Sequence, residues 1–184
     1  MTWLYLHLVT NHFPVTLTLL GTIVCAIGAA KRNTNAWYYG VVTLVLGAIG
    51  AVPSWISGYQ AHYVVENQLG FPEGTVEPHE LLAEATMWVM IPLGILAGFT
   101  WWRWRQEPKR GPSPPWIRPA LLITAVMGTV MLGITAFLGG KIGHGQTPRP
   151  ATARDSAAAA AQQNFQPLPT EPIRRPGTPD TTRK

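Results

Sequence analysis

Four long apolar stretches separated by polar segments dominate the 184-residue chain. They cover residues 13–30, 36–56, 81–102 and 117–140, and each is close to the roughly 20 residues that a helix needs to cross a ~30 Å hydrocarbon core. Leu, Ile, Val, Ala and Gly occur on all sides of each predicted helix, whereas a helix of a soluble protein carries a polar face. The pattern predicts an all-α protein, a four-transmembrane-helix bundle in contact with membrane lipid. Asn11 is expected to cap the first helix.

The distribution of Lys and Arg predicts the orientation of the bundle, because these residues collect in the cytoplasmic connections of membrane proteins. The connections after the first and third stretches carry Lys31, Arg32, Arg103, Arg105, Lys109, Arg110 and Arg118. The connection 57–80 has no Lys or Arg and carries four Glu. We therefore expect a multi-pass protein of the bacterial inner (cytoplasmic) membrane with both termini on the periplasmic side. No signal-peptide pattern opens the chain, so the first stretch is expected to direct insertion.

Composition excludes several classes of function. Only 12% of the residues are charged, about half the ~25% that is usual for soluble proteins. The formal charge of +5 is divided between the basic connections and the C-terminal segment, so it reports topology and predicts no nucleic-acid partner. The single cysteine, Cys25, rules out an intramolecular disulfide, a cysteine zinc site and covalent haem attachment. No nucleophilic triad, phosphate-binding loop or zincin motif is present, and the chain is predicted not to be an enzyme.

All five histidines belong to one end of the predicted bundle. His7 and His12 precede or open the first stretch, His62 follows the second, His79 precedes the third and His144 follows the fourth. Histidine is the commonest metal ligand and also ligates b-type haem. The candidate ligands for haem or a metal are His12, His79, His62, His144 and Glu84, with Glu80 as a further metal ligand.

The depth of the candidate histidines in the membrane distinguishes between haem and a metal ion as the ligand. Only His12 and His79 lie at the hydrocarbon edge, whereas His62 and His144 lie nearer water. The hydrated His/Glu cluster is better suited to a transition metal such as copper, and a haem b held by His12 and His79 is the second possibility. Glu84 is an intramembrane carboxylate, which is a functional candidate by default. The alternative interpretation is that the histidines are polar helix ends without a ligand, and that Glu84 bonds to a neighbouring helix.

The C-terminal segment differs in composition from the rest of the chain. Residues 1–145 form the predicted transmembrane domain, and 146–184 form an extended, Pro- and Ala-rich tail. Such a segment cannot bury enough apolar surface to order itself, so we expect it to be disordered or to bind a partner. The candidate partner-binding residues are its large apolar side chains and an Arg pair: Phe165, Leu168, Ile173, Arg174 and Arg175.

Several of these features resemble a widespread family of predicted four-helix bacterial membrane proteins that is catalogued as a domain of unknown function. The matching residues are His7 and His12 followed by Phe13-Pro14, Ser57-Gly58 at the end of the second stretch, His79 opening the third, and Gly139-Gly140-x-Ile142 with His144-Gly145 closing the fourth. The typical opening of the family is His-Pro-x-x-Val-His-Phe-Pro, and this chain has Leu8 and Asn11 at the Pro and Val positions. The resemblance covers about residues 5–145 and implies the four-span fold and outward histidines, but no reaction.

Two hypotheses of function follow. The first is a non-catalytic accessory subunit that stabilises a larger respiratory or photosynthetic membrane complex and contacts other subunits through its tail. The second is a small redox or metal-binding membrane protein that holds haem b or copper at the histidine cluster. The tail favours the first hypothesis, and the one-sided histidines favour the second.

Overall fold

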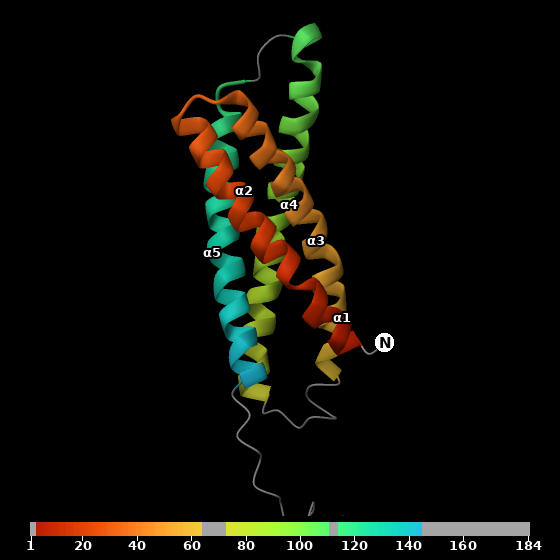
Figure 1. The fold of residues 1–184 in the computed structure, drawn as a ribbon. Coiled ribbons are helices and arrows are strands. Elements are labelled where there is room, and N and C mark those ends of the chain that lie inside the picture. Colours follow the sequence, from red (N-terminus) through yellow and green to blue (C-terminus); the bar gives the residue numbers. More distant parts are fainter. Residues whose placement is uncertain (1–2, 64–72, 111–113, 145–184) are drawn as a thin grey trace, which may run out of the picture. The chain divides into compact units, whose positions relative to one another are not determined.

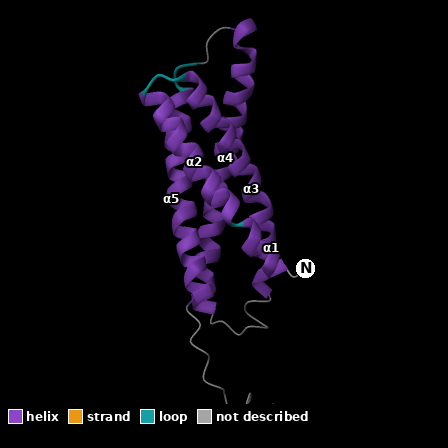
Figure 2. Ribbon diagram, in the orientation of Figure 1, coloured by secondary structure: helices purple, strands orange, loops and turns teal. Residues whose placement is uncertain are grey.

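The structure is a computed structural model that describes residues 3–63, 73–110 and 114–144, and all long elements within these ranges are helices. They are α1 (Trp3–Thr10), α2 (His12–Ala30), α3 (Thr34–Tyr63), α4 (Glu73–Arg110) and α5 (Ile117–His144) (Figures 1 and 2). Across the described ranges, four helical segments are long and apolar enough to cross a membrane: Trp3–Ala30, Thr34–His62, Val76–Gln106 and Ile117–Ile142. The all-α four-span fold is therefore confirmed, and the chain is a multi-pass membrane protein.

The first span starts at Trp3 rather than at residue 13, because α1 and α2 together form one segment. Residues Trp3–Leu6, Leu8 and Val9 surround His7 with apolar side chains, so this region continues the span. Asn11 separates the two helices without interrupting the hydrogen bonding, since its backbone N–H donates to the carbonyl oxygen of His7 at 3.0 Å. The expectation that Asn11 caps α2 is wrong: its backbone is helical, and its side chain makes no cap hydrogen bond.

Successive spans run in opposite directions, which gives the bundle two chemically different ends (Figure 1). We call one the histidine end, where α1 and α4 begin and α3 and α5 end; it carries His7, His62, His79 and His144. We call the other the basic end, and it carries Lys31, Arg32, Arg103, Arg105 and Arg118. The turn from α2 to α3 at the basic end is tight, with Arg32 in the left-handed region at φ 51°. Asn33 Oδ1 then accepts the backbone N–H of Ala36 at 3.0 Å and caps α3.

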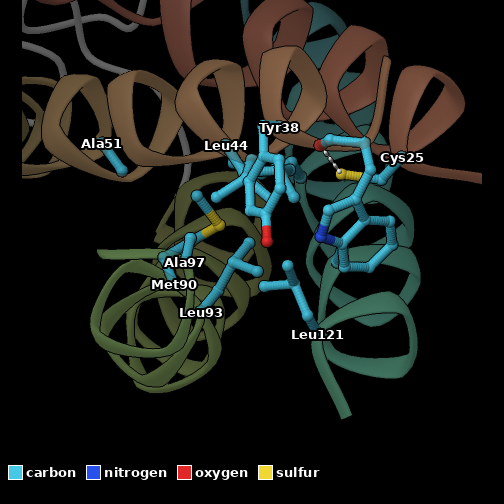
Figure 3. Close-up of a cluster of buried hydrophobic side chains, with 12 residues drawn as sticks. Cys25, Tyr38, Leu44, Ala51, Met90, Leu93, Ala97 and Leu121 are labelled. Carbon is cyan, nitrogen blue, oxygen red and sulfur yellow. Dashed lines mark hydrogen bonds between the residues drawn. The ribbon is translucent and has the colours of Figure 1, made fainter. Parts of the chain in front are cut away.

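Glycines allow α2 and α3 to pack backbone against backbone. A Cβ atom placed on Gly28 would lie 2.7 Å from Cα of Trp37 and would also meet its backbone nitrogen, and one on Gly40 would lie 2.6 Å from the backbone nitrogen of Cys25. Beside this contact, the Cys25 thiol donates to the carbonyl oxygen of Trp37 at 3.6 Å (Figure 3). The close approach of α2 and α3 makes them a rigid support for the rest of the bundle.

The core joins the α2–α3 pair to α4 and α5. Tyr38 of α3 is buried and reaches toward Leu93 of α4 and Leu121 of α5, both fully buried (Figure 3). The outward surfaces carry large apolar side chains such as Ile95 and Phe137, which are 68% and 62% exposed. Water would disfavour this arrangement, whereas lipid accommodates it.

Candidate functional site

His7 is held by α3 through a hydrogen bond and a glycine contact. Its Nδ1 lies 2.9 Å from the carbonyl oxygen of Ser54. A carbonyl only accepts hydrogen bonds, so Nδ1 carries the proton in this contact, and Nε2 is the acceptor atom of the neutral ring. One turn further along α3, a Cβ atom on Gly58 would lie 2.9 Å from Cε1 and 3.7 Å from Nε2 of this imidazole. The ring therefore packs where Gly58 has no side chain.

His79 is held by α5 in the same way. Its Nδ1 lies 2.9 Å from the carbonyl oxygen of Thr135, which again fixes the proton on Nδ1 and leaves Nε2 as the free acceptor. One turn further along α5, a Cβ atom on Gly139 would lie 3.0 Å from Cε1 and 3.7 Å from Nε2 of His79. The first two spans form one half of the bundle, and the last two spans form the other half. In each half, the first span supplies the histidine. The second span supplies the carbonyl and, four residues later, the glycine.

The two imidazoles meet between the halves of the bundle. Their ring centres lie 6.5 Å apart, and the ring planes make an angle of 80°. Each imidazole comes from a different half of the bundle and has its Nδ1 bonded to a backbone carbonyl. This pair is the strongest candidate for a functional site in the described part of the chain.

Small polar side chains surround the pair. Thr10 Oγ1 lies 3.3 Å from Ser57 Oγ beside His7, and Thr86 Oγ1 lies 3.1 Å from Thr135 Oγ1 beside His79. One turn after His7, on the same side of the helix, the Asn11 Oδ1 atom is buried and has no hydrogen-bond partner. A buried polar atom without a partner costs free energy, so this acceptor is an unexplained polar feature next to the histidines.

The other predicted ligands are distributed differently. His62 Nδ1 lies 3.3 Å from a carboxylate oxygen of Glu80, so these two side chains are brought together. His12 and Glu84 are exposed, and the side chain of His144 lies outside the part that the structure describes. Over the described ranges, no three His, Cys, Asp or Glu side chains converge into a set that could hold a metal ion. The predicted partner residues Phe165, Leu168, Ile173, Arg174 and Arg175 also lie outside the described residues.

His7 is the site residue that sequence reasoning missed. The polar run Thr10-Asn11-His12 suggested that the first span starts after it, which placed His7 outside the membrane. The signal that could have found it is the apolar character of its neighbours, which continues the span to Trp3. The glycines at 58 and 139 were a second signal, because both lie at the histidine ends of their spans.

Comparison of the chain with protein-family models, with curated proteins and with solved structures finds no match. The resemblance to a family of four-helix membrane proteins therefore stays a prediction, and the function has to be argued from the site itself.

Proposed function

We propose that this protein is a small membrane redox protein that binds one b-type haem between His7 and His79. The observation that carries the proposal is the pair itself: two imidazoles from different halves of the bundle, 6.5 Å apart, each with Nδ1 bonded to a backbone carbonyl. Histidines that ligate a metal almost always donate their other N–H to a carbonyl or carboxylate, which fixes the tautomer and raises ligand basicity.

The number of ligands favours haem over a bare metal ion. Zinc and copper sites take three or four protein ligands, and no such set forms among the described residues. The porphyrin supplies four nitrogens to its iron, so two imidazoles complete the coordination. This donor set leads us to propose haem rather than copper.

The two rings are near neighbours, with centres 6.5 Å apart and planes at 80° in a T-shaped arrangement. The missing side chains at Gly58 and Gly139 let the Cε1 edge of each imidazole pack closely against the neighbouring helix. Admitting the macrocycle requires the two halves to separate at the histidine end.

The proposal includes an orientation. We place the histidine end on the periplasmic side of a bacterial inner membrane, because the basic end carries the Lys and Arg residues, whereas Glu77, Glu80 and Glu84 follow the start of α4. Electron exchange with the haem then takes place from the outer side. The accessory-subunit hypothesis depends on residues 146–184, outside the described ranges, and stays a prediction.

The test is the absorption spectrum of the full chain purified after expression with a haem precursor. The wild-type protein and the exposed-histidine control His12→Ala should both show a Soret band and a reduced-minus-oxidised difference spectrum of haem b. His7→Ala and His79→Ala should each weaken haem retention. A wild-type protein that stays colourless, even after incubation with hemin, would show that the pair serves only to pack the bundle.

A further inference from the structure

Two arginines at the basic end are held over tryptophan rings. The guanidinium carbon of Arg105 lies 5.3 Å from the centre of the Trp101 ring, which is one turn earlier on α4. The guanidinium carbon of Arg118, on α5, lies 5.5 Å from the centre of the Trp37 ring, on α3. Both arginines are exposed, whereas Trp37 is buried. Each contact therefore keeps an exposed positive charge against the surface of the bundle.

These two charges are not neutralised by any carboxylate that the structure describes. The described acidic side chains, Glu77, Glu80 and Glu84, all lie on the half of α4 nearer the histidine end, and none of them pairs with Arg105 or Arg118. A guanidinium that lies over a ring can still donate its N–H groups to an anion. Phosphate is a good match, because two of its oxygens fit the fork of N–H donors.

The tryptophans at this end indicate the level of the two arginines in the membrane. Trp101, Trp102 and Trp116 are 38%, 41% and 56% exposed, and exposed tryptophan settles at the depth of the lipid headgroups. The preference of Lys and Arg for cytoplasmic connections explains why charges collect at this end. It does not require that they be held against rings, at the level where lipid phosphates lie.

We propose that Arg105 and Arg118 each bind the headgroup phosphate of an anionic phospholipid in the adjoining leaflet. A zwitterionic lipid carries its own cation beside the phosphate, so guanidinium groups without carboxylate partners favour the anionic lipid. Exposed apolar side chains further along α5, such as Ile123 and Val126, provide a surface for the acyl chains. The exposed tryptophans favour lipid over an acidic protein from the aqueous side. This site is independent of the histidine pair.

The experiment is native mass spectrometry of the full chain in detergent, with equal amounts of phosphatidylglycerol and phosphatidylcholine that carry the same acyl chains. The wild-type protein should retain phosphatidylglycerol in preference to phosphatidylcholine. Arg105→Gln and Arg118→Gln should each weaken the binding of phosphatidylglycerol about fivefold. The matched control is Lys141→Gln, because Lys141 Nζ also lies over a ring, 4.7 Å from the centre of Phe137, but at the histidine end. This control should bind phosphatidylglycerol as the wild-type protein does.

Three results would overturn the proposal. The first is equal retention of the two lipids by the wild-type protein, which would leave the basic residues with a role in orientation alone. The second is an equal effect of Lys141→Gln and Arg105→Gln, which would show a response to net charge rather than to the basic end. The third is displacement of the lipid by inorganic phosphate, which would show a site for free anions.

Discussion

The two ends of the bundle use the same small residue for different purposes. At the basic end, Gly28 lets the backbone of α2 touch that of α3 at Trp37. At the histidine end, Gly58 and Gly139 face imidazole rings rather than backbone. A glycine that faces backbone brings two helices together, whereas a glycine that faces an imidazole lets that ring pack against the helix.

The contacts around these glycines differ in the same way. At the basic end, the rings of Tyr38 and Trp104 stack with centres 4.3 Å apart, and the Arg118 guanidinium lies 5.5 Å from the centre of the Trp37 ring. These aromatic and cation–π contacts pack the helices together at the basic end. The histidine end instead has hydroxyl pairs, two imidazoles bonded to backbone carbonyls and the unpartnered Asn11 Oδ1. The comparison indicates that apolar packing closes one end of the bundle, whereas polar groups gather at the other.

The largest expected effect concerns the side of the membrane on which each end of the bundle lies. Its outcome is all-or-none. Reporter fusions at Asn33, at the basic end, and at Gly74, at the histidine end, should report opposite sides of the membrane, with Gly74 outside the cytoplasm. The reason is the accumulation of Lys and Arg at the basic end. A cytoplasmic signal at Gly74 would reverse the orientation that we propose.

The next largest effect is on stability. Gly28→Ala should lower the free energy of unfolding by about 1–3 kcal/mol, because its Cβ would overlap backbone atoms of Trp37 that cannot move aside. The measurement is the midpoint of thermal unfolding in detergent. Gly98→Ala is the matched control, since no heavy atom lies within 4 Å of its added Cβ and Ala is the better helix former. Equal midpoints for the two variants would contradict the close contact between α2 and α3.

A smaller effect on stability, but a distinct effect on the site, is expected at the histidine end. Gly58→Ala and Gly139→Ala place a methyl group about 3 Å from Cε1 of an imidazole, which can shift more easily than backbone. We expect lower haem retention or an altered Soret band, with a smaller loss of thermal stability than for Gly28→Ala. Gly133→Ala, on α5 in open surroundings, is the control. If these variants lose stability as Gly28→Ala does but retain haem normally, the two ends do not differ as we describe.

The sequence determined the fold more completely than the site. Four apolar stretches of membrane-crossing length were enough to predict four spans, because length and composition decide insertion. The bounds of the first span could not be predicted so well, since Thr10, Asn11 and His12 look like a boundary although hydrogen bonding continues through them. The one-sided histidines indicated the end of the bundle at which His7 and His79 lie near each other. The pairing of His79 with His7 rather than with His12 depends on which face of a helix turns inward, and a run that is apolar on all sides carries no such signal.

The most direct test of the central claim is the molar ratio of haem to protein, measured by pyridine haemochrome on the purified full chain. Our account predicts equimolar haem in the wild-type protein and in the double variant His12→Ala/His62→Ala, which removes two other histidines of the described residues. It predicts no haem in His7→Ala/His79→Ala, although that protein should still insert into the membrane. Haem that persists without His7 and His79, or a wild-type protein that binds none, would contradict it.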